Sequence, residues 1–507
     1  MTITTSSLWT ETAPAPDRPA LEADLDVEVC VVGAGILGMT AALLLARDGV
    51  EVAVVDADEV GSGVTGHTTA KVTVLHGSAY QDVRKKFGDD GARDYARANQ
   101  AGFEQIAALV EEIGIDCDFR RKPAYTYVAD PQEASTIEEE VAATQAAGLA
   151  TVGTVETPLP YEVASAVRLD GQAEFHARRY VLGLATELER LGGRIFQHTR
   201  ITALSERGGL SIETESGRTI TARDVVVATL MPIFDRGLFF SRCTCKRSYA
   251  IAVRTASGEG IDGMLISADE PSRSIRSAPD PDGDGELMII GGEGHTTGED
   301  DDTTQRYEAL EAFAREQFKA TEVTHRWSSH DLVPADGLPY IGHLTPLSKR
   351  VWTAAGFRKW GFTNGTMAAL ELTERIQGRP SPWGDRFDAN RFTPRQSAVG
   401  LAKEGFKDAR HMISDRMKGP EVASLDEIAP GEGKWVKLDG ELVAAFRDDD
   451  GAVSAVSPNC THLGCRVMFN TAERSWDCPC HGSRFAPDGR VLQGPAVKPL
   501  ARKEVSG

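Results

Sequence analysis

Two cysteines and two histidines near the C-terminal end of the chain have the types and the spacing of a metal centre. Cys460 and His462 are separated by one residue, and after fifteen further residues Cys478 and His481 are separated by two. Two thiolates and two imidazoles can hold either a tetrahedral zinc ion or an iron–sulfur centre. Structural zinc sites usually arrange their ligands as Cys-x-x-Cys and His-x-x-x-His pairs, which this pattern lacks. The spacing therefore favours an iron–sulfur centre and leaves zinc as the alternative.

The surrounding region, from Pro420 to Leu500, resembles the Rieske [2Fe–2S] proteins. It shares their pattern of short strands, which we expect at 434–436, 442–446 and 452–456. The resemblance implies a cluster held by Cys460, His462, Cys478 and His481. It also implies a disulfide between Cys465 and Cys480, which would persist in a reducing cytosol because it is enclosed beside the cluster. Free thiols are the alternative at those two positions.

Two further positions bear on the reduction potential of the implied cluster. Ser483 stands at the family's hydroxyl-donor position, and hydrogen bonds to cluster sulfur raise the potential. Phe485 stands where high-potential respiratory members carry a tyrosine that bonds a ligand sulfur. We therefore expect a potential below theirs and above that of plant-type ferredoxins.

A glycine-rich turn near the start of the chain could bind a dinucleotide. The apolar run Val27–Val32 predicts a buried parallel strand, a G-x-G-x-x-G turn follows it, and a helix is expected over 39–47. A second strand, over 51–55, ends at Asp56, which is suitably placed for a ribose hydroxyl. Together these features predict a dinucleotide site with the pyrophosphate at the helix N-terminus, and an empty Rossmann unit is the alternative. The candidate contacts are Gly33, Ala34, Gly35, Ile36, Leu37, Gly38, Asp56 and Ala57.

A second match to the same glycine spacing, over 61–66, has a different interpretation. Neither a helical run nor a strand ending in an acid follows it, so we interpret it as a ligand-contacting loop. The residues that continue from it to Lys71 are small or carry hydroxyl groups, and they could hydrogen-bond a cofactor along their backbone. The candidate contacts in this loop are Gly63, Thr65, Gly66, His67, Thr68, Thr69 and Ala70.

The order of the elements over residues 27–385 resembles the glycine oxidase and D-amino-acid oxidase superfamily of FAD-dependent oxidoreductases. A helix is expected over 175–191, a strand over 219–230, another over 351–354, and a late helix over 366–376 that follows a glycine-rich turn. The resemblance implies that the first strand–helix–strand unit holds the ADP part of FAD and that the late glycine-rich turn meets the flavin. Carried over by position, the additional contacts are Ile201, Ala228, Thr229, Gly356, Trp360, Gly361 and Thr363.

The resemblance leaves the flavin linkage and the substrate site open. His67 sits where some sarcosine and dimethylglycine dehydrogenases attach their flavin through a histidine, but its context matches theirs loosely and non-covalent contact is favoured. For substrate contacts we nominate Tyr249, His330, Lys359 and Trp360, which could anchor an acid group or flank the flavin ring.

The composition excludes several classes of partner. The 507 residues include 55 Lys and Arg against 75 Asp and Glu, a formal net charge of −20, which disfavours binding to nucleic acid or to an anionic membrane surface. No apolar stretch is long enough to span a bilayer, and the start of the chain does not have the pattern of a signal peptide. We therefore expect a cytoplasmic protein.

The domain organisation follows from these motifs. We predict a mobile tail (1–26), an FAD-dependent oxidoreductase domain (27–385), a linker with a helix (386–419) and a Rieske domain (420–507). The expected fold class is α/β, with a Rossmann-type FAD-binding domain, an inserted mixed β-sheet substrate domain and a small all-β Rieske domain.

The pairing of the two cofactors indicates the function. Flavin accepts two electrons at once and can release them singly, whereas a [2Fe–2S] cluster accepts only one. Since the resembled superfamily oxidises carbon–nitrogen bonds, we expect a small amine, amino acid or N-methyl compound to reduce FAD, and electrons to pass through the cluster to an external one-electron acceptor. The alternatives are an oxidase that uses O2 and has a structural Rieske domain, and a non-catalytic electron-transfer partner of another enzyme.

Overall fold

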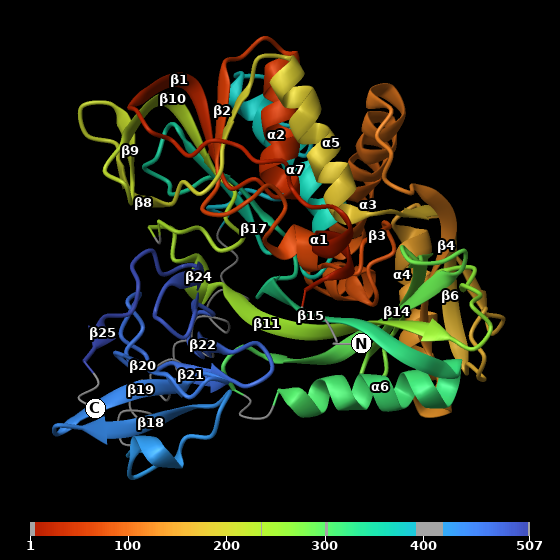
Figure 1. The fold of residues 1–507 in the computed structure, drawn as a ribbon. Coiled ribbons are helices and arrows are strands. Elements are labelled where there is room, and N and C mark those ends of the chain that lie inside the picture. Colours follow the sequence, from red (N-terminus) through yellow and green to blue (C-terminus); the bar gives the residue numbers. More distant parts are fainter. Residues whose placement is uncertain (1–5, 235, 300–302, 392–418, 505–507) are drawn as a thin grey trace.

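The computed structural model describes residues 6–234, 236–299, 303–391 and 419–504. Residues 6–391, apart from the two gaps, form an N-terminal unit built on two large sheets, and residues 419–504 form a C-terminal unit built on two small ones (Figure 1). The first large sheet runs in the order β16 (Tyr340–His343), β17 (Val351–Ala355), β10 (Thr219–Val227), β1 (Leu25–Val32), β2 (Val52–Val55) and β7 (Arg194–Phe196), with β9 (Leu210–Thr214) beside β10 and β8 (Ile201–Ser205) beside β9.

The centre of the first sheet is parallel and fully buried. β1 pairs in parallel with both β10 and β2, and Val29, Cys30 and Val31 have no exposed surface. An uninterrupted apolar strand is stable there because both faces of the sheet are covered. Figure 1 shows three helices on one side of the sheet: α2 (Ile36–Arg47), α5 (Ala177–Arg190) and α7 (Gly361–Ile376).

The second sheet runs in the order β15 (Ala320–Pro334), β11 (Cys243–Thr255), β14 (Glu286–Thr296), β13 (Arg273–Pro279), β12 (Met264–Ser267), β4 (Arg120–Val128), β6 (Ser165–Glu174) and β3 (Lys71–Val72), with β5 (Val152–Thr154) beside β6. Its two faces belong to different cores. Ala250, Ala252 and Trp327 lie on an inner face, in the same apolar core as α2 and α7. Tyr249 and Ile251 lie on an outer face with Leu310 of α6 (Thr304–Phe318).

Two further helices, α3 and α4, belong to the N-terminal unit. α3 (Ala79–Ile113) is interrupted at Gly88, and it lies so close to α7 that a Cβ atom on Gly102 would be 2.4 Å from the carbonyl oxygen of Thr363. α4 (Ala134–Ala146) contributes Glu140, whose carboxylate accepts hydrogen bonds from two backbone amides in the first turn of α3. Short 3-10 turns occur at η1 (Val64–His67), η2 (Pro131–Glu133) and η3 (Phe239–Ser241).

The C-terminal unit consists of two antiparallel sheets of four strands. The first contains β18 (Gly433–Leu438), β19 (Glu441–Arg447), β20 (Val453–Val456) and β25 (Arg502–Lys503), and the 3-10 turn η4 (Leu425–Glu427) precedes it. The second contains β21 (Met468–Asn470), β22 (Ser475–Asp477), β23 (Arg484–Phe485) and β24 (Val491–Gln493). Figure 1 shows this blue unit beside the beginning of β11.

The strands and helices expected from the sequence are present, with small shifts at their ends. The largest shift is in α7, which begins at Gly361 rather than at residue 366, directly after Trp360. The predicted helix of the linker lies outside the described residues. The predicted boundary at residue 385 is too early, because Phe387 and Ala389 are buried in the N-terminal unit and Arg391 forms an ion pair with Asp336.

The prediction of a mobile N-terminal tail is wrong from residue 6 onward. Leu8 and Trp9 of α1 (Leu8–Thr12) are 2% and 1% exposed, and Arg18 pairs with Glu189 of α5. The acid- and proline-rich composition of residues 1–26 gave no sign that the short apolar segment at Leu8 and Trp9 is buried by the rest of the fold. The energy of burying a tryptophan and a leucine side chain favours this docked arrangement over a free tail.

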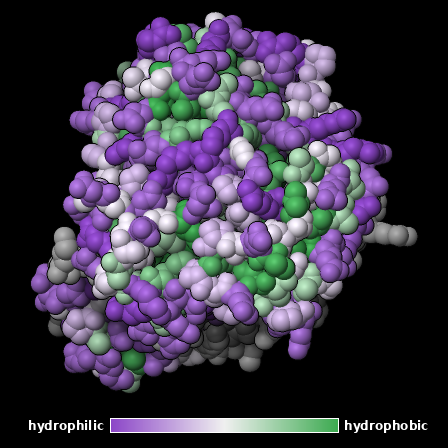
Figure 2. All heavy atoms as spheres, turned by 90° about the vertical axis from the view of Figure 1, so that its right-hand side faces the viewer, coloured by the Kyte–Doolittle hydropathy of each residue, from purple (hydrophilic) through white to green (hydrophobic). Residues whose placement is uncertain are grey.

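The surface is largely hydrophilic, as the charge content predicts. Figure 2 shows polar side chains over most of the face seen from the right of Figure 1, with hydrophobic side chains gathered in patches on its lower half. Among the helices of the described residues, none is both long enough and apolar enough to cross a membrane.

Candidate functional site

The glycine turn after β1 has the geometry that a dinucleotide site requires. Gly33 has a φ of +110°, which disfavours residues with a side chain. A Cβ atom on Gly38 would lie 1.9 Å from the carbonyl oxygen of Gly33, so only glycine lets α2 begin this close to the turn. Asp56, at the end of β2, accepts a 2.6 Å hydrogen bond from the amide of Ala34. The turn, the helix N-terminus and the acid therefore meet at one place, as the sequence predicted.

The second predicted contact segment, residues 63–70, lies against the same helix N-terminus. The hydroxyl of Thr65 accepts a 3.1 Å hydrogen bond from the amide of Ile36 in the first turn of α2. At the end of β10, the carbonyl oxygen of Ala228 would be 2.5 Å from a Cβ atom on Gly33. Ile201 is buried in β8, two residues after Thr199, whose amide donates to the Asp56 carbonyl. Segments up to 195 residues apart thus converge on the glycine turn.

Side chains from other elements fix the backbone of this loop. The Ser7 hydroxyl donates to the carbonyl of Gly66, the Trp9 indole donates to that of Thr68 at 2.7 Å, and the indole of Trp327 in β15 donates to that of His67 at 3.1 Å. The Nδ1 atom of His67 lies 2.9 Å from the Gly63 carbonyl oxygen, and burial lowers the pKa of its imidazole. His67 is therefore neutral at physiological pH.

The late glycine-rich turn, which precedes α7, brings a lysine and a tryptophan to the inner face of the second sheet. Arg358 and Lys359 both have a positive φ, of 53° and 68°, a conformation that costs of order 1 kcal/mol or more for each residue other than glycine. Trp360 stacks on His76 with 4.8 Å between ring centroids, and Thr363 lies 3.0 Å from the same imidazole. This turn is strained, as turns at functional sites often are.

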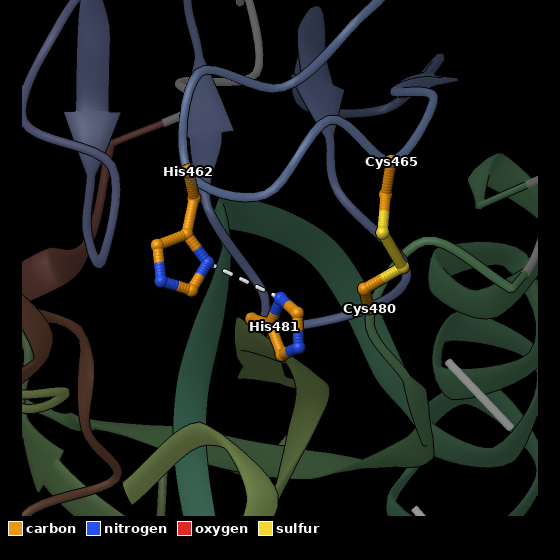
Figure 3. The surroundings of a disulfide bond; sticks show 4 residues. All are labelled: His462, Cys465, Cys480 and His481. Atoms are coloured by element: carbon orange, nitrogen blue, oxygen red, sulfur yellow. Dashed lines mark hydrogen bonds between the residues drawn. A yellow bond between two sulfur atoms is a disulfide. The ribbon is translucent and has the colours of Figure 1, made fainter. Parts of the chain in front are cut away.

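In the C-terminal unit, the four spaced residues lie on two loops that face each other. The Nδ1 atoms of His462 and His481 are 3.2 Å apart and point toward one another (Figure 3). Two nitrogens bound to one tetrahedral metal at about 2 Å would be roughly 3.3 Å apart, so the pair fits a single metal ion. A hydrogen bond with Cys478 lowers the pKa of the Cys460 thiol to about 7, which indicates that these two sulfurs are also adjacent.

The disulfide implied by the resemblance is present. Cys465 and Cys480 are bonded (Figure 3). Their sulfurs lie within 4.8 Å of that of Cys478. Because the bonded pair has no thiolate to offer, Cys460 and Cys478 remain as the sulfur donors beside the two imidazoles. The Ser483 hydroxyl is fully buried and accepts a 3.0 Å hydrogen bond from the amide of Ala496, so the 494–496 loop lies over this site.

The two candidate histidine ligands have different surroundings. His481 is 3% exposed, and its ring contacts the ring of Phe240 in η3, with 4.5 Å between centroids. The Cys245 thiol of β11 donates a 3.2 Å hydrogen bond to the carbonyl of His481. His462 is only partly buried, and Leu463 beside it is 47% exposed. Both rings therefore contact Phe240 of the N-terminal unit, His481 at 4.5 Å and His462 at 5.7 Å between centroids, and His462 lies nearer the solvent.

Comparison with known proteins agrees with this geometry. The model of the FAD dependent oxidoreductase family DAO matches residues 28–375, and that of the Rieske [2Fe-2S] domain matches residues 420–504. The chain belongs to the DAO family of FAD-dependent oxidoreductases. Its C-terminal unit is a Rieske domain. The predicted fold class, FAD and the [2Fe–2S] cluster are thereby confirmed.

Several relatives of this oxidoreductase are informative. It is 34% identical over 493 residues to YhfW of Bacillus subtilis, named as a Rieske 2Fe-2S iron-sulfur protein, with 97% of this chain and 96% of that protein covered. It is 24% identical over 384 residues to gamma-glutamylputrescine oxidoreductase of Escherichia coli, with 73% and 87% covered. The crystal structure of glycine oxidase from Geobacillus kaustophilus shares its fold, with a TM-score of 0.60, 17% identity, and 73% of this chain and 100% of that chain covered.

The four nominated substrate residues of the oxidoreductase do not lie together. Lys359 lies on the inner face of the second sheet, where burial and the neighbouring Lys246 lower its pKa and Asp331 raises it. Trp360 follows it in the same turn.

The other two nominated residues lie on the outer face. Tyr249 is stacked on His295, and His330 pairs with Arg247 across β11 and β15. Alternation along the strands thus separates these residues, which the sequence alone did not resolve.

Sequence reasoning missed Lys71, which directly follows the loop over residues 63–70. This loop is called the cofactor loop below. Its ammonium group donates to the hydroxyls of Thr69 and Ser274, and no carboxylate contacts it among the described residues. Burial lowers the pKa of Lys71 to about 7, Arg276 adds to this effect and Glu174 opposes it. The available signal was a lysine at the end of a loop of small and hydroxyl residues, leading into a buried strand. A lysine that is partly neutral near pH 7 can accept a proton.

Proposed function

We propose that the protein oxidises a small C–N substrate, such as an amine, an amino acid or an N-methyl compound, at FAD and transfers the electrons singly to its own Rieske cluster and then to an external acceptor. The DAO family and the names of the relatives, gamma-glutamylputrescine oxidoreductase and glycine oxidase, support the substrate class. FAD takes up a hydride equivalent and releases single electrons, and the cluster carries one electron at a time.

The observation that carries this proposal is the docking of His481 on the oxidoreductase domain. Phe240 and the Cys245 thiol both contact this candidate ligand, and it is 3% exposed. A Rieske domain with a purely structural role would need no contact at a cluster ligand. Electron transfer requires that two centres lie close together, and this contact brings a candidate cluster ligand against the domain that would bind FAD.

The candidate cofactor contacts keep the assignments predicted from the sequence. The glycine turn and Asp56 would hold the ADP part of FAD, residues 63–70 would lie along the flavin, and the turn that ends at Trp360 would meet its ring. Cys460, His462, Cys478 and His481 would hold the cluster. On the inner face, Lys71 would accept the proton that the substrate nitrogen must lose before oxidation, and Lys359 would attract an acid group of the substrate.

An anaerobic absorbance titration of the holoprotein tests the proposed function. Amines, N-methylated amino acids and NAD(P)H are added separately while the flavin and cluster bands are followed. The expected result is that a C–N compound bleaches the flavin band first and the cluster band next. Reduction by NAD(P)H alone would contradict the proposal and indicate the opposite direction of electron flow. Peroxide formation in air with an oxidised cluster would instead indicate an oxidase.

A further inference from the structure

The strand pair β11–β15 separates the two candidate cofactor sites. On its inner face, Lys246 donates to Thr296 at 3.1 Å and lies within electrostatic range of Lys359, in the turn expected to meet the flavin. On its outer face, Cys245 bonds the carbonyl of His481. Neighbouring residues of one strand therefore face the two sites, so a single sheet layer lies between them.

His330 belongs to the same contact on the outer face. A Cβ atom on Gly482, the residue after His481, would be 2.7 Å from the His330 ring and 2.8 Å from the Cys245 sulfur. Only glycine at this position lets the ligand loop lie directly on the two strands. This close contact exists only while the Rieske domain lies in this position.

A cluster of polar side chains at the edge of this contact can hold it there. Arg247 of β11 is 2% exposed and forms a 2.9 Å ion pair with Glu473, in the turn between β21 and β22 of the Rieske domain. The Tyr307 hydroxyl of α6 donates to the other oxygen of Glu473 at 2.9 Å, and Arg484 lies 3.7 Å from the same carboxylate. Burial alone would raise the pKa of Glu473, but Arg247 and Arg484 hold it below its usual value, so the carboxylate is charged.

The same turn has two further bonds to the oxidoreductase domain. The Thr303 hydroxyl donates to the side-chain oxygen of Asn470 at 2.7 Å and accepts from the amide of Ala472 at 3.0 Å. The ion pair also acts on the cofactor loop, because Glu473 raises and Arg247 lowers the pKa of His67. The turn between β21 and β22 is thus bonded to β11 and to the residue before α6, and its charge acts on the loop over 63–70.

We infer that Arg247, Glu473 and Tyr307 form an interdomain clamp that holds the Rieske domain in one docked position, so that electrons cross β11–β15 without movement of the domain. This inference rests on the proposed function. The clamp residues are positioning residues, because they hold the His481 loop and touch neither cofactor site directly. Each crossing would take one electron from the flavin and give it to the cluster. The flavin proton would be released to water, and an external one-electron carrier would reoxidise the cluster before the second crossing.

Because the buried Arg247 pairs with the charged Glu473, the variant Glu473→Gln tests the clamp directly. Removing one partner of a buried ion pair leaves the other charge unpaired, whereas replacing both with apolar residues is often neutral. We therefore compare Glu473→Gln with the double variant Arg247→Met/Glu473→Leu. Glu441→Gln is the matched control, since Glu441 pairs with Lys503 on an exposed surface of the same domain.

The experiment reduces the flavin photochemically in the holoprotein, without any amine substrate, and follows cluster reduction at increasing glycerol concentration. Hydrogen exchange of peptides covering 470–485 is measured on the same samples. In the wild type and in Glu441→Gln, the rate should not change with viscosity. In Glu473→Gln, exchange should be faster by about a hundredfold or more, given the cost of a broken buried pair, and cluster reduction should slow as viscosity rises. The double variant should recover most of the protection.

The outcomes separate the clamp from the proposed function. If the cluster of the wild type is reduced at a viscosity-dependent rate, the fixed docking is wrong while the electron route stands. If Glu473→Gln behaves like Glu441→Gln, the clamp is wrong. If the photoreduced flavin never reduces the cluster, the proposed electron route itself fails.

Discussion

The Rieske centre and the flavin site differ in how the chain assembles them. All four candidate ligands and the disulfide of the Rieske centre lie within residues 460–481. The candidate flavin contacts extend from Gly33 to Thr363 and come from the first large sheet, the loop over 63–70 and α7. A local site is defined by its spacing, whereas a dispersed site depends on the whole domain. We therefore expect that a substitution that prevents cofactor binding at one site leaves cofactor binding at the other site unchanged.

The largest expected effect is the complete loss of one centre with the other retained. Cys460→Ser removes a candidate thiolate ligand of the cluster, so the cluster absorbance and its EPR signal should disappear while bound FAD remains at full occupancy. Cofactor analysis of the purified variant measures both. Loss of FAD along with the cluster would show that the two sites are coupled during folding.

The converse variant should remove the flavin and leave the cluster. In Gly38→Val, the new Cβ atom would be 1.9 Å from the Gly33 carbonyl oxygen, so α2 can no longer begin at the turn that would hold the pyrophosphate. The protein should purify without FAD but with cluster absorbance. Thr202→Val, at a β8 side chain that bonds the carbonyl of Glu213 in β9, is a control that should keep both cofactors.

Within the flavin site, Lys71→Met should slow flavin reduction by a C–N substrate by about 10²- to 10⁴-fold, the usual contribution of a general base. In the wild type the rate should rise as pH increases through about 7, because the ammonium form of Lys71 cannot accept a proton. Stopped-flow reduction across a pH series measures both effects.

Lys122→Met is the control for that variant. Lys122 lies on β4 of the same sheet and pairs with Asp262, so its replacement should leave the rate and the pH profile unchanged. A Lys71→Met variant that keeps the wild-type pH dependence would exclude Lys71 as the base.

The smallest expected effect concerns stability within the Rieske domain alone. Replacing both Cys465 and Cys480 by Ser removes a cross-link between residues 15 apart, which should cost about 3 kcal/mol of unfolding free energy. Thermal bleaching of the cluster should therefore occur at lower temperature, while flavin release stays unchanged. An equal shift of both transitions would indicate that the two domains unfold as one unit.

The sequence allowed the Rieske centre to be predicted in more detail than the substrate site. Spacing indicated a metal centre at two cysteines and two histidines, and the resemblance to Rieske proteins implied the cluster, its four ligands and the disulfide. For the substrate site, a nomination by residue type placed Tyr249 and His330 beside Lys359. The structure separates them because successive residues of β11 and β15 face opposite sides of the sheet. Nothing in the sequence shows which face of β11 and β15 will lie toward the core of the oxidoreductase domain and which will contact the Rieske domain.

The N-terminal segment illustrates the same limit. Its composition predicted a tail, yet Trp9 donates a hydrogen bond to the cofactor loop and is almost fully buried. A short apolar segment has no amphipathic period long enough to reveal a docked helix. Its partner, the loop over 63–70, becomes available only after the domain has folded.

The sequence by itself determined the two domains, their cofactors and the order of their elements, because glycine turns, buried strands and ligand spacings are local requirements of backbone geometry and coordination chemistry. Only the tertiary structure decided how the cofactor sites face one another. It placed the two candidate sites on opposite faces of β11–β15, joined Arg247 to Glu473 across the domains and buried His481 at their contact. These contacts arise from the complementarity of two folded surfaces, and that complementarity exists only once both chain segments have their final shape.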